Sequence, residues 1–173
     1  MAERTSNDWL AVMRVLGAVA LLCVGGLHYQ QYRYAFYSSV PTIGPLFLAN
    51  FIGATVAGLC LLAPVGSRLG RRGELLQRLA ALAGVGIAAG GLAALLISEQ
   101  TPLFGFMEHG YRFVIVLTIA SEAAVIVLLT LFLIRACSDA RGQSAVRQHE
   151  RSGTHPAREP VNQRPGVPVT ERR

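Results

Sequence analysis

The sequence contains no lysine and few charged residues of any kind. All sixteen basic residues are arginines, charged residues make up only 15% of the 173 residues, and apolar residues make up 52%. With a mean hydropathy of +0.43, this composition argues against an ordinary water-soluble globule. The net charge of +6 therefore indicates a bilayer surface as the charged partner, and no nucleic-acid partner is expected.

The sequence also lacks the motifs of soluble enzymes. Its three cysteines form no CxxC pair, and its four histidines have no zinc-ligand spacing. It has no phosphate-binding glycine loop, no nucleophile elbow and no HExxH motif. We therefore predict no catalytic residue, no metal site and no cofactor.

What the sequence does contain is four long apolar segments. They cover about residues 9–27, 45–65, 79–97 and 113–134. Each is close to the roughly 20 residues that an α-helix needs to cross the hydrocarbon core of a bilayer. The first ends in bulky residues instead of a small-residue cleavage site, so we interpret it as an uncleaved anchor. The sequence thus predicts an all-α membrane protein with four transmembrane helices in a bundle.

The arginines predict the orientation of these helices. Four lie in the connection 66–78 and eight in the tail 135–173, whereas the other two connections hold only Arg33 and Arg112. Positive residues beside membrane spans stay in the cytoplasm. Both termini and the connection 66–78 are therefore predicted to be cytoplasmic, with the protein in the plasma membrane.

The Arg- and Pro-rich tail, residues 135–173, is predicted to be disordered because it has almost no large apolar residues to bury. Two interpretations of this tail stay open. It is either a solvated segment attracted to anionic lipid or a docking site for a cytoplasmic partner.

Three polar residues inside the predicted spans are the main candidates for chemistry: Glu122, Asn50 and Arg14. Glu122 is predicted to lie near the bilayer midplane, where a carboxylate is costly unless it is protonated or paired. It either fixes helix packing by bonding Asn50, Ser121 or Thr118, or binds a proton or cation, or contacts a lipid or quinone-like ligand. Arg14 either snorkels to the cytoplasmic boundary or reaches Glu122.

The two predicted exterior connections, 28–44 and 98–112, form a second candidate region. Four of the five tyrosines lie between residues 29 and 37, as is typical of an interfacial aromatic belt. The two connections either cap the bundle together or form a recognition surface. The candidate residues of that surface are His28, Arg33, Glu108 and His109.

Small residues recur at a spacing that favours close helix packing. Gly86 and Gly90 form a GxxxG pattern, and Ala54 and Gly58 repeat the spacing in the preceding span. Such patterns let two backbones approach closely. They predict either packing within the chain's own bundle or homodimerisation.

Four stretches of the chain resemble small four-helix integral membrane proteins of actinobacteria. They are 28–34 (HYQQYRY), 40–48 (VPTIGPLFL), 103–108 (LFGFME) and 122–125 (EAAV). The resemblance covers roughly residues 9–134 and implies a four-helix plasma-membrane protein. That family is of uncharacterised function, so the resemblance implies no activity.

We therefore expect a structural or accessory membrane protein that assembles with itself or with another membrane component. The alternative is a proton-linked small-molecule transporter that uses Glu122, with Asn50 and His28 on the path. Small multidrug exporters carry their membrane carboxylate in the first helix, whereas here it is in the fourth. This difference argues against assigning their mechanism to this chain. An exterior enzyme using His28 and Glu108 is a third hypothesis, and the sequence supplies it with no nucleophile and no metal.

Overall fold

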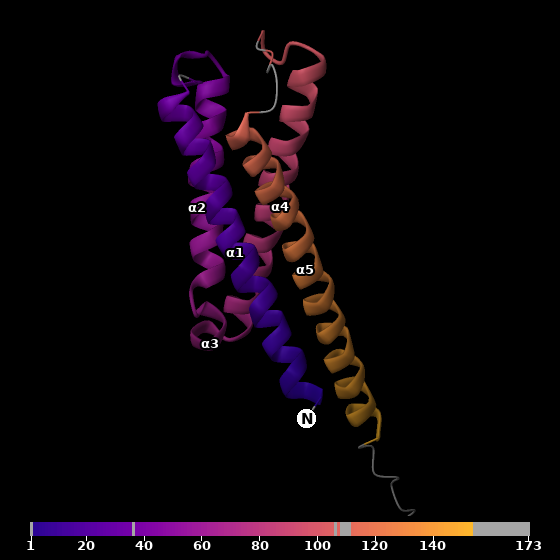
Figure 1. Cartoon of the computed structure of the whole chain (residues 1–173). Helices are drawn as coiled ribbons and strands as arrows, with labels where there is room; N and C mark the ends of the chain where they lie inside the picture. Colours follow the sequence, from indigo (N-terminus) through magenta and orange to yellow (C-terminus); the bar gives the residue numbers. More distant parts are fainter. Residues whose placement is uncertain (1, 36, 106, 108–111, 154–173) are drawn as a thin grey trace, which may run out of the picture. The chain divides into compact units, whose positions relative to one another are not determined.

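Four long α-helices dominate the computed structural model, which describes residues 2–35, 37–105, 107 and 112–153 (Figure 1). The helical elements are α1 Ala2–Tyr34, η1 Tyr37–Ser39, α2 Ile43–Leu62, α3 Val65–Leu69, α4 Arg71–Gln100 and α5 Phe113–Gly153. The described residues contain no β-strand. The predicted all-α fold is confirmed.

Each long helix contains a segment long and apolar enough to cross a membrane. These segments are Asp8–Tyr34, Ile43–Leu62, Arg71–Gln100 and Phe113–Gly142. Large apolar side chains point outward from all four helices: Leu16, Val56, Leu82 and Val127 are 51%, 62%, 60% and 56% exposed. Exposed apolar surface of this extent is unfavourable in water but not among lipid tails. The four predicted transmembrane helices are therefore confirmed.

The helices approach one another where one of them carries a small residue. Gly58 of α2 lies against Leu22 of α1, and Gly84 of α4 lies against Leu21 of α1 and Leu129 of α5. Leu21 and Leu129 are both fully buried. Packing of this kind is the main attraction between helices in lipid, where water does not drive apolar side chains together.

The Gly86–Gly90 pair of α4 does not take part in this packing. A Cβ atom added at either position would meet nothing within 4 Å, whereas Gly84 and Ala88 of the same helix are buried. Two residues along an α-helix correspond to a rotation of about 200°, so the two sets lie on opposite sides. The GxxxG pattern thus faces away from the described bundle, and homodimerisation through it stays a prediction.

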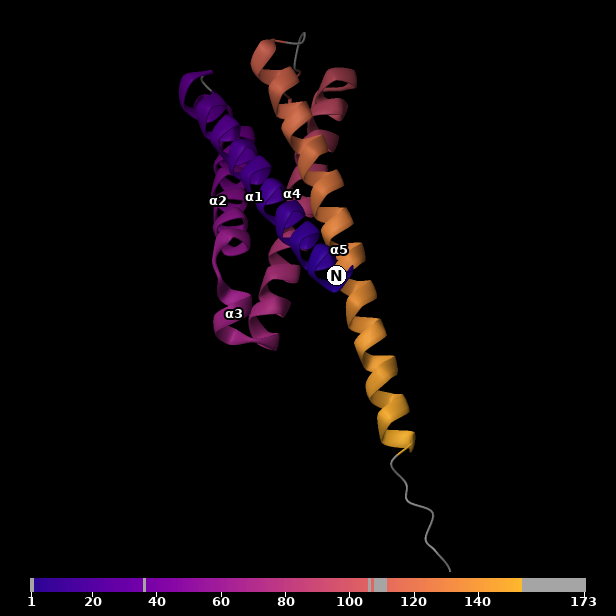
Figure 2. The ribbon, with the colours of Figure 1, turned by 60° about the horizontal axis from the view of Figure 1, so that its bottom comes forward.

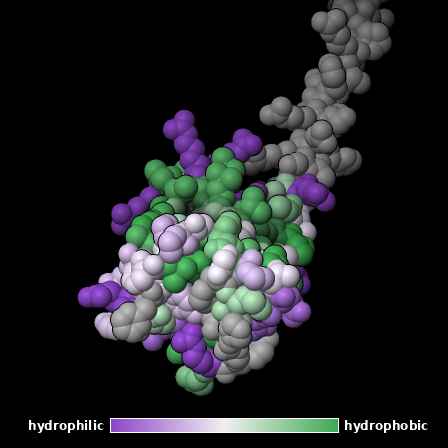
Figure 3. Space-filling view, turned by 90° about the horizontal axis from the view of Figure 1, so that it is seen from above, coloured by the Kyte–Doolittle hydropathy of each residue, from purple (hydrophilic) through white to green (hydrophobic). Residues whose placement is uncertain are grey.

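The two ends of the bundle are formed by different connections. The start of α1 and the short helix α3 lie at one end, and η1 and the end of α4 lie at the other, which we call the η1 end (Figures 1 and 2). In Figure 2 the α1–α2 pair and the α4–α5 pair spread apart toward the η1 end. In the view from this end, strongly hydrophilic side chains stand mainly at the periphery (Figure 3).

Two helices are longer than the hydropathy pattern predicts. The first predicted span ends at residue 27, but α1 continues to Tyr34, because the run 28–34 contains neither proline nor glycine. The fourth ends at residue 134, but α5 continues to Gly153. The segment 135–153 has no proline and is rich in alanine, arginine and glutamine, which favour helix. The prediction of disorder therefore differs from the structure over 135–153, and residues 154–173 lie outside the described residues.

Candidate functional site

A cavity of about 130 Å³ lies between the four long helices, from the middle of the bundle toward the η1 end. Polar side chains from three helices meet in one part of its wall: His28 of α1, Asn50 of α2 and Glu122 of α5. Other polar side chains of the wall are Gln31, Tyr37, Ser98 and Thr118. The walls are otherwise mostly apolar and include Leu46, Leu95, Leu103 and Ile115. The cavity therefore joins a small polar region to an apolar chamber.

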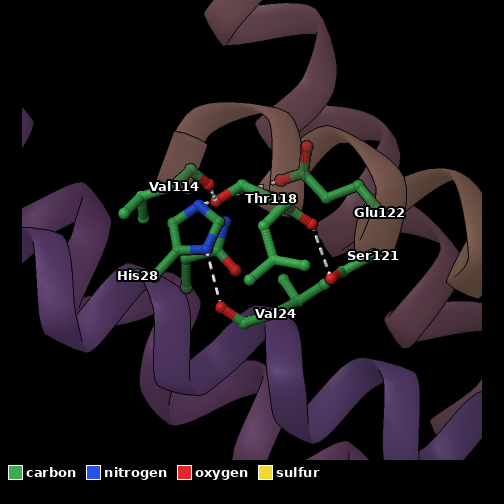
Figure 4. Close-up of polar contacts among 8 residues, drawn as sticks. Val24, His28, Val114, Thr118, Ser121 and Glu122 are labelled. Atoms are coloured by element: carbon green, nitrogen blue, oxygen red, sulfur yellow. Dashed lines mark hydrogen bonds and ion pairs between the residues drawn. The ribbon is translucent and has the colours of Figure 1, made fainter. Parts of the chain in front are cut away.

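Glu122 is the most deeply buried ionisable residue of the site, with only 1% of its surface exposed. Neither carboxyl oxygen has a hydrogen-bond partner among the described residues. The two hydroxyls predicted as partners bond elsewhere: Thr118 Oγ1 donates to Val114 O at 2.9 Å and Ser121 Oγ to Leu117 O at 2.7 Å (Figure 4). The carboxyl thus receives no hydrogen bond from the described residues and faces the cavity.

His28 stands opposite Glu122 with a fixed ring orientation. Its Nδ1 lies 2.9 Å from Val24 O (Figure 4), and because a carbonyl oxygen only accepts, Nδ1 carries the hydrogen of this bond. Nε2 then points toward the carboxyl and lies 3.8 Å from Glu122 Oε1. The ring packs at a centroid distance of 5.2 Å against Phe47. His28 can therefore exchange a proton with the cavity only at Nε2.

Asn50 completes the polar region. Its Nδ2 lies 3.1 Å from His28 Nε2, so in the neutral ring the amide donates and Nε2 accepts. Asn50 Oδ1 is buried without a hydrogen-bond partner within the described part of the chain. Together with the two oxygens of Glu122, the site holds three buried acceptor atoms that receive no hydrogen bond.

Gly91 of α4 makes room for this polar group. A Cβ atom at residue 91 would overlap Glu122 Oε1 and would lie 3.2 Å from Asn50 Nδ2. Any larger residue would force the carboxyl or the amide aside. Each of the four long helices therefore contributes one residue to the site. The residue from α4 is a glycine, which leaves space for the carboxyl and the amide.

An aromatic stack borders the cavity nearer the η1 end. The rings of Tyr37 and Phe47 are stacked with a centroid distance of 4.8 Å and an interplanar angle of 13°. Arg112 Nη2 donates to Tyr37 Oη at 3.0 Å, which links η1 to the start of α5. The backbone of η1 comes close to Gly44, where a Cβ would lie 2.8 Å from Tyr37 O. These contacts fix Tyr37 at the cavity.

Arg14 does not belong to the site. Its Nη1 donates to the backbone carbonyl of Leu61 in the last turn of α2. Carbonyls of the last helical turn have no partner within their own helix, and a cation there interacts favourably with the helix dipole. Of the two interpretations of Arg14, reaching Glu122 is wrong, and the guanidinium stabilises a helix end instead.

The predicted exterior surface is only partly described. His28 is 7% exposed and lies within α1, so its placement in the exterior connection was wrong, because α1 runs past the apolar segment. Arg33 is exposed in the last turn of α1. Glu108 and His109 lie outside the described residues.

The sequence interpretation missed the role of Gly91 beside Glu122 and the Tyr37–Arg112 contact. Gly91 belongs to a helix with many small residues, so nothing in the sequence distinguishes it from Gly86 or Gly90. Tyr37 and Arg112 are 75 residues apart, and only the folding of the chain brings them together.

No group of three or more His, Cys, Asp or Glu side chains in the described ranges could hold a metal ion. Comparisons of the chain with family models, with curated proteins and with solved structures found no match. The resemblance to actinobacterial membrane proteins therefore stays a prediction, and the cavity is the feature of the chain that indicates a function.

Proposed function

We propose that the chain is a multi-pass membrane protein that binds a small molecule in the cavity and carries it across the membrane in exchange for a proton on Glu122. The observation that carries this proposal is the buried carboxyl of Glu122, whose two oxygens receive no hydrogen bond from the described residues and face a cavity. Buried polar groups are normally hydrogen-bonded. An ionisable residue inside a membrane that the fold does not hold by hydrogen bonds favours a functional role.

The surroundings of Glu122 support exchange of a proton for a ligand. In the described part of the chain, the titratable side chains that line the cavity are His28, Tyr37 and Glu122, and no arginine lines it. A carboxylate without a cation is costly in a bilayer. While the His28 ring is neutral and accepts from Asn50 Nδ2, the site is therefore neutral either when Glu122 carries a proton or when a positively charged group occupies the cavity.

The experiment that tests proton exchange is labelling with dicyclohexylcarbodiimide, an apolar reagent that reacts with protonated carboxyls within lipid. The protein is reconstituted in vesicles, labelled at a series of pH values from about 5 to about 9, and analysed by peptide mass spectrometry. We expect modification of Glu122 that decreases as the pH rises. Glu122→Gln supplies the unreactive control. Absence of modification, or modification that is independent of pH, would refute proton exchange at this residue.

The structural or accessory role expected from the sequence stays a prediction, as does assembly with another membrane component. No cavity or contact in the described residues favours that role over ligand binding. Glu122→Gln distinguishes the two functions. It leaves expression and assembly intact in both cases, but it abolishes transport if a titrating carboxyl is required.

The orientation proposed for the bundle has both termini in the cytoplasm and the η1 end outside, in a plasma membrane. The distribution of arginines supports it. Arg68, Arg71, Arg72 and Arg78 lie in or next to α3 and the start of α4, whereas Arg33 and Arg112 lie at the η1 end. Because positive residues are more frequent on the cytoplasmic side of a membrane, the end with α3 is assigned to the cytoplasm. The cavity is then nearer the exterior.

A further inference from the structure

We infer that the ligand is a small primary ammonium ion with a compact apolar body, bound through its three N–H groups to Glu122 and Asn50. This inference rests on the proposed function and specifies the substrate class of the same cavity. It follows from three properties of the site: the kind of hydrogen-bonding atoms left without partners, the balance of charge, and the size and lining of the chamber.

The hydrogen-bonding atoms of the polar region require a ligand that donates. Glu122 Oε1, Glu122 Oε2 and Asn50 Oδ1 are all acceptors when the carboxyl is ionised, and all three are buried without partners in the described structure. The nearby donor, Asn50 Nδ2, is already directed to His28 Nε2. A primary ammonium group carries three N–H donors and no acceptor, which matches this set.

The charge balance selects a cation over a neutral donor. An ionised Glu122 has no cationic side chain within salt-bridge distance among the described residues other than His28, at 3.8 Å and only when its ring is protonated. A neutral alcohol supplies one donor and leaves the carboxylate uncompensated. A quaternary ammonium ion supplies the charge but has no N–H group, so the three acceptors would stay without hydrogen bonds.

The chamber limits the rest of the ligand. Its volume of about 130 Å³ is slightly below the roughly 150 Å³ of an apolar cavity that holds benzene. Leu46, Leu95, Leu103 and Ile115 line its apolar part. Among the described residues, a bare metal ion would find only three oxygens without hydrogen bonds in the polar region, where hard cations prefer about six or more ligands. A short alkyl or ring substituent of about four to six carbons fits both the size and the lining.

The test compares three probes of similar size: n-butylammonium, n-butanol and tetramethylammonium. Binding is measured by isothermal titration calorimetry on the full chain in lipid nanodiscs, with empty nanodiscs subtracted for partition into lipid. We expect butylammonium to bind at least about tenfold more tightly than either other probe, since charge-assisted hydrogen bonds are lost in both.

Two variants and one control assign the binding to the site. Glu122→Gln removes the charge and Gly91→Ala places a methyl group against Glu122 Oε1, so each is expected to weaken butylammonium binding at least about tenfold. Ser121→Ala is the matched control on α5, because Ser121 Oγ bonds Leu117 O of its own helix and does not line the cavity. It should bind butylammonium as the wild type does.

The outcomes separate this inference from the function on which it rests. Equal binding of butanol or tetramethylammonium, still dependent on Glu122, overturns the primary ammonium class and leaves the proposed function standing. The ammonium class is also overturned, and the proposed function left standing, if butylammonium does not bind but carbodiimide labelling still depends on pH. Binding of sodium ions without binding of butylammonium has the same meaning. Loss of both butylammonium binding and labelling overturns the inference and the proposed function together.

Discussion

Replacement of Glu122 by methionine should stabilise the bundle, and this prediction distinguishes a ligand-binding carboxyl from a packing residue. Glu122 is 1% exposed and its carboxyl oxygens receive no hydrogen bond among the described residues. A buried polar group left without a hydrogen bond costs about 1–3 kcal/mol. Methionine has a similar length, is flexible and carries no polar hydrogen-bonding group, so Glu122→Met removes this cost.

Two smaller effects reduce the expected gain. A shape-conserving exchange in a packed core usually costs less than about 1.5 kcal/mol, and the substitution also removes the approach of the carboxyl to His28 at 3.8 Å. We therefore expect the free energy of unfolding to rise by about 1 kcal/mol, which is a factor of about 5 in the unfolding equilibrium constant.

The assay is reversible unfolding in mixed micelles with increasing denaturing detergent, followed by helical circular dichroism. Ala120→Met is the matched control, because Ala120 lies on an exposed position of the same helix and its exchange should change the free energy by less than about 0.5 kcal/mol. Destabilisation by Glu122→Met of more than about 1 kcal/mol would refute the reasoning, since it would mean that the fold depends on the carboxyl.

Three further predictions concern the remainder of the bundle. Arg14→Ala should lower the free energy of unfolding by about 1.5 kcal/mol in the same assay, because Leu61 O loses a charged donor; an unchanged value would contradict this role. Leu129→Ala should cost about 2–5 kcal/mol, since Leu129 fills the space beside Gly17 and Gly84, whereas Leu129→Met should cost less than about 1.5 kcal/mol. A membrane-impermeant maleimide should label the exposed Cys137 only after cells are permeabilised, and Ser39→Cys in a Cys137→Ser background should be labelled in intact cells. The reverse labelling pattern would overturn the proposed orientation.

Hydropathy predicted the spans because a bilayer imposes a minimum length of apolar helix, but it could not predict where the helices end. The turns of α1 beyond Leu27 are polar and aromatic, so they carry no hydropathy signal although nothing in them breaks a helix. This difference has a functional consequence. Because α1 ends at Tyr34, His28 is a buried residue of the site and not, as predicted, a residue of an exterior connection.

Glu122 and Asn50 could be identified from the sequence because polar residues are costly and therefore conspicuous within an apolar segment. Their mutual arrangement could not, since it depends on how each helix is rotated about its axis. The partners predicted for Glu122 from proximity in the sequence, Thr118 and Ser121, bond backbone carbonyls one turn earlier in α5. Hydroxyls in a helix often satisfy themselves in this way, which leaves the carboxyl free for the cavity.

The geometry of His28 connects ligand binding to the movement of a proton. Binding an ammonium ion requires that Glu122 lose its proton, and the basic atom facing the carboxyl is His28 Nε2, at 3.8 Å. Since Nδ1 already donates to Val24 O, a proton accepted by the ring has to be held at Nε2. Nε2 would then be a donor and could no longer accept the hydrogen bond from Asn50 Nδ2. Asn50 would have to turn its amide so that Oδ1 accepts from Nε2–H, and that oxygen would then be lost to the ligand. Protonation of His28 and binding of the ammonium ion therefore exclude each other, because both use Glu122 and Asn50 Oδ1, and the proton released by Glu122 has to leave the site when the ligand binds.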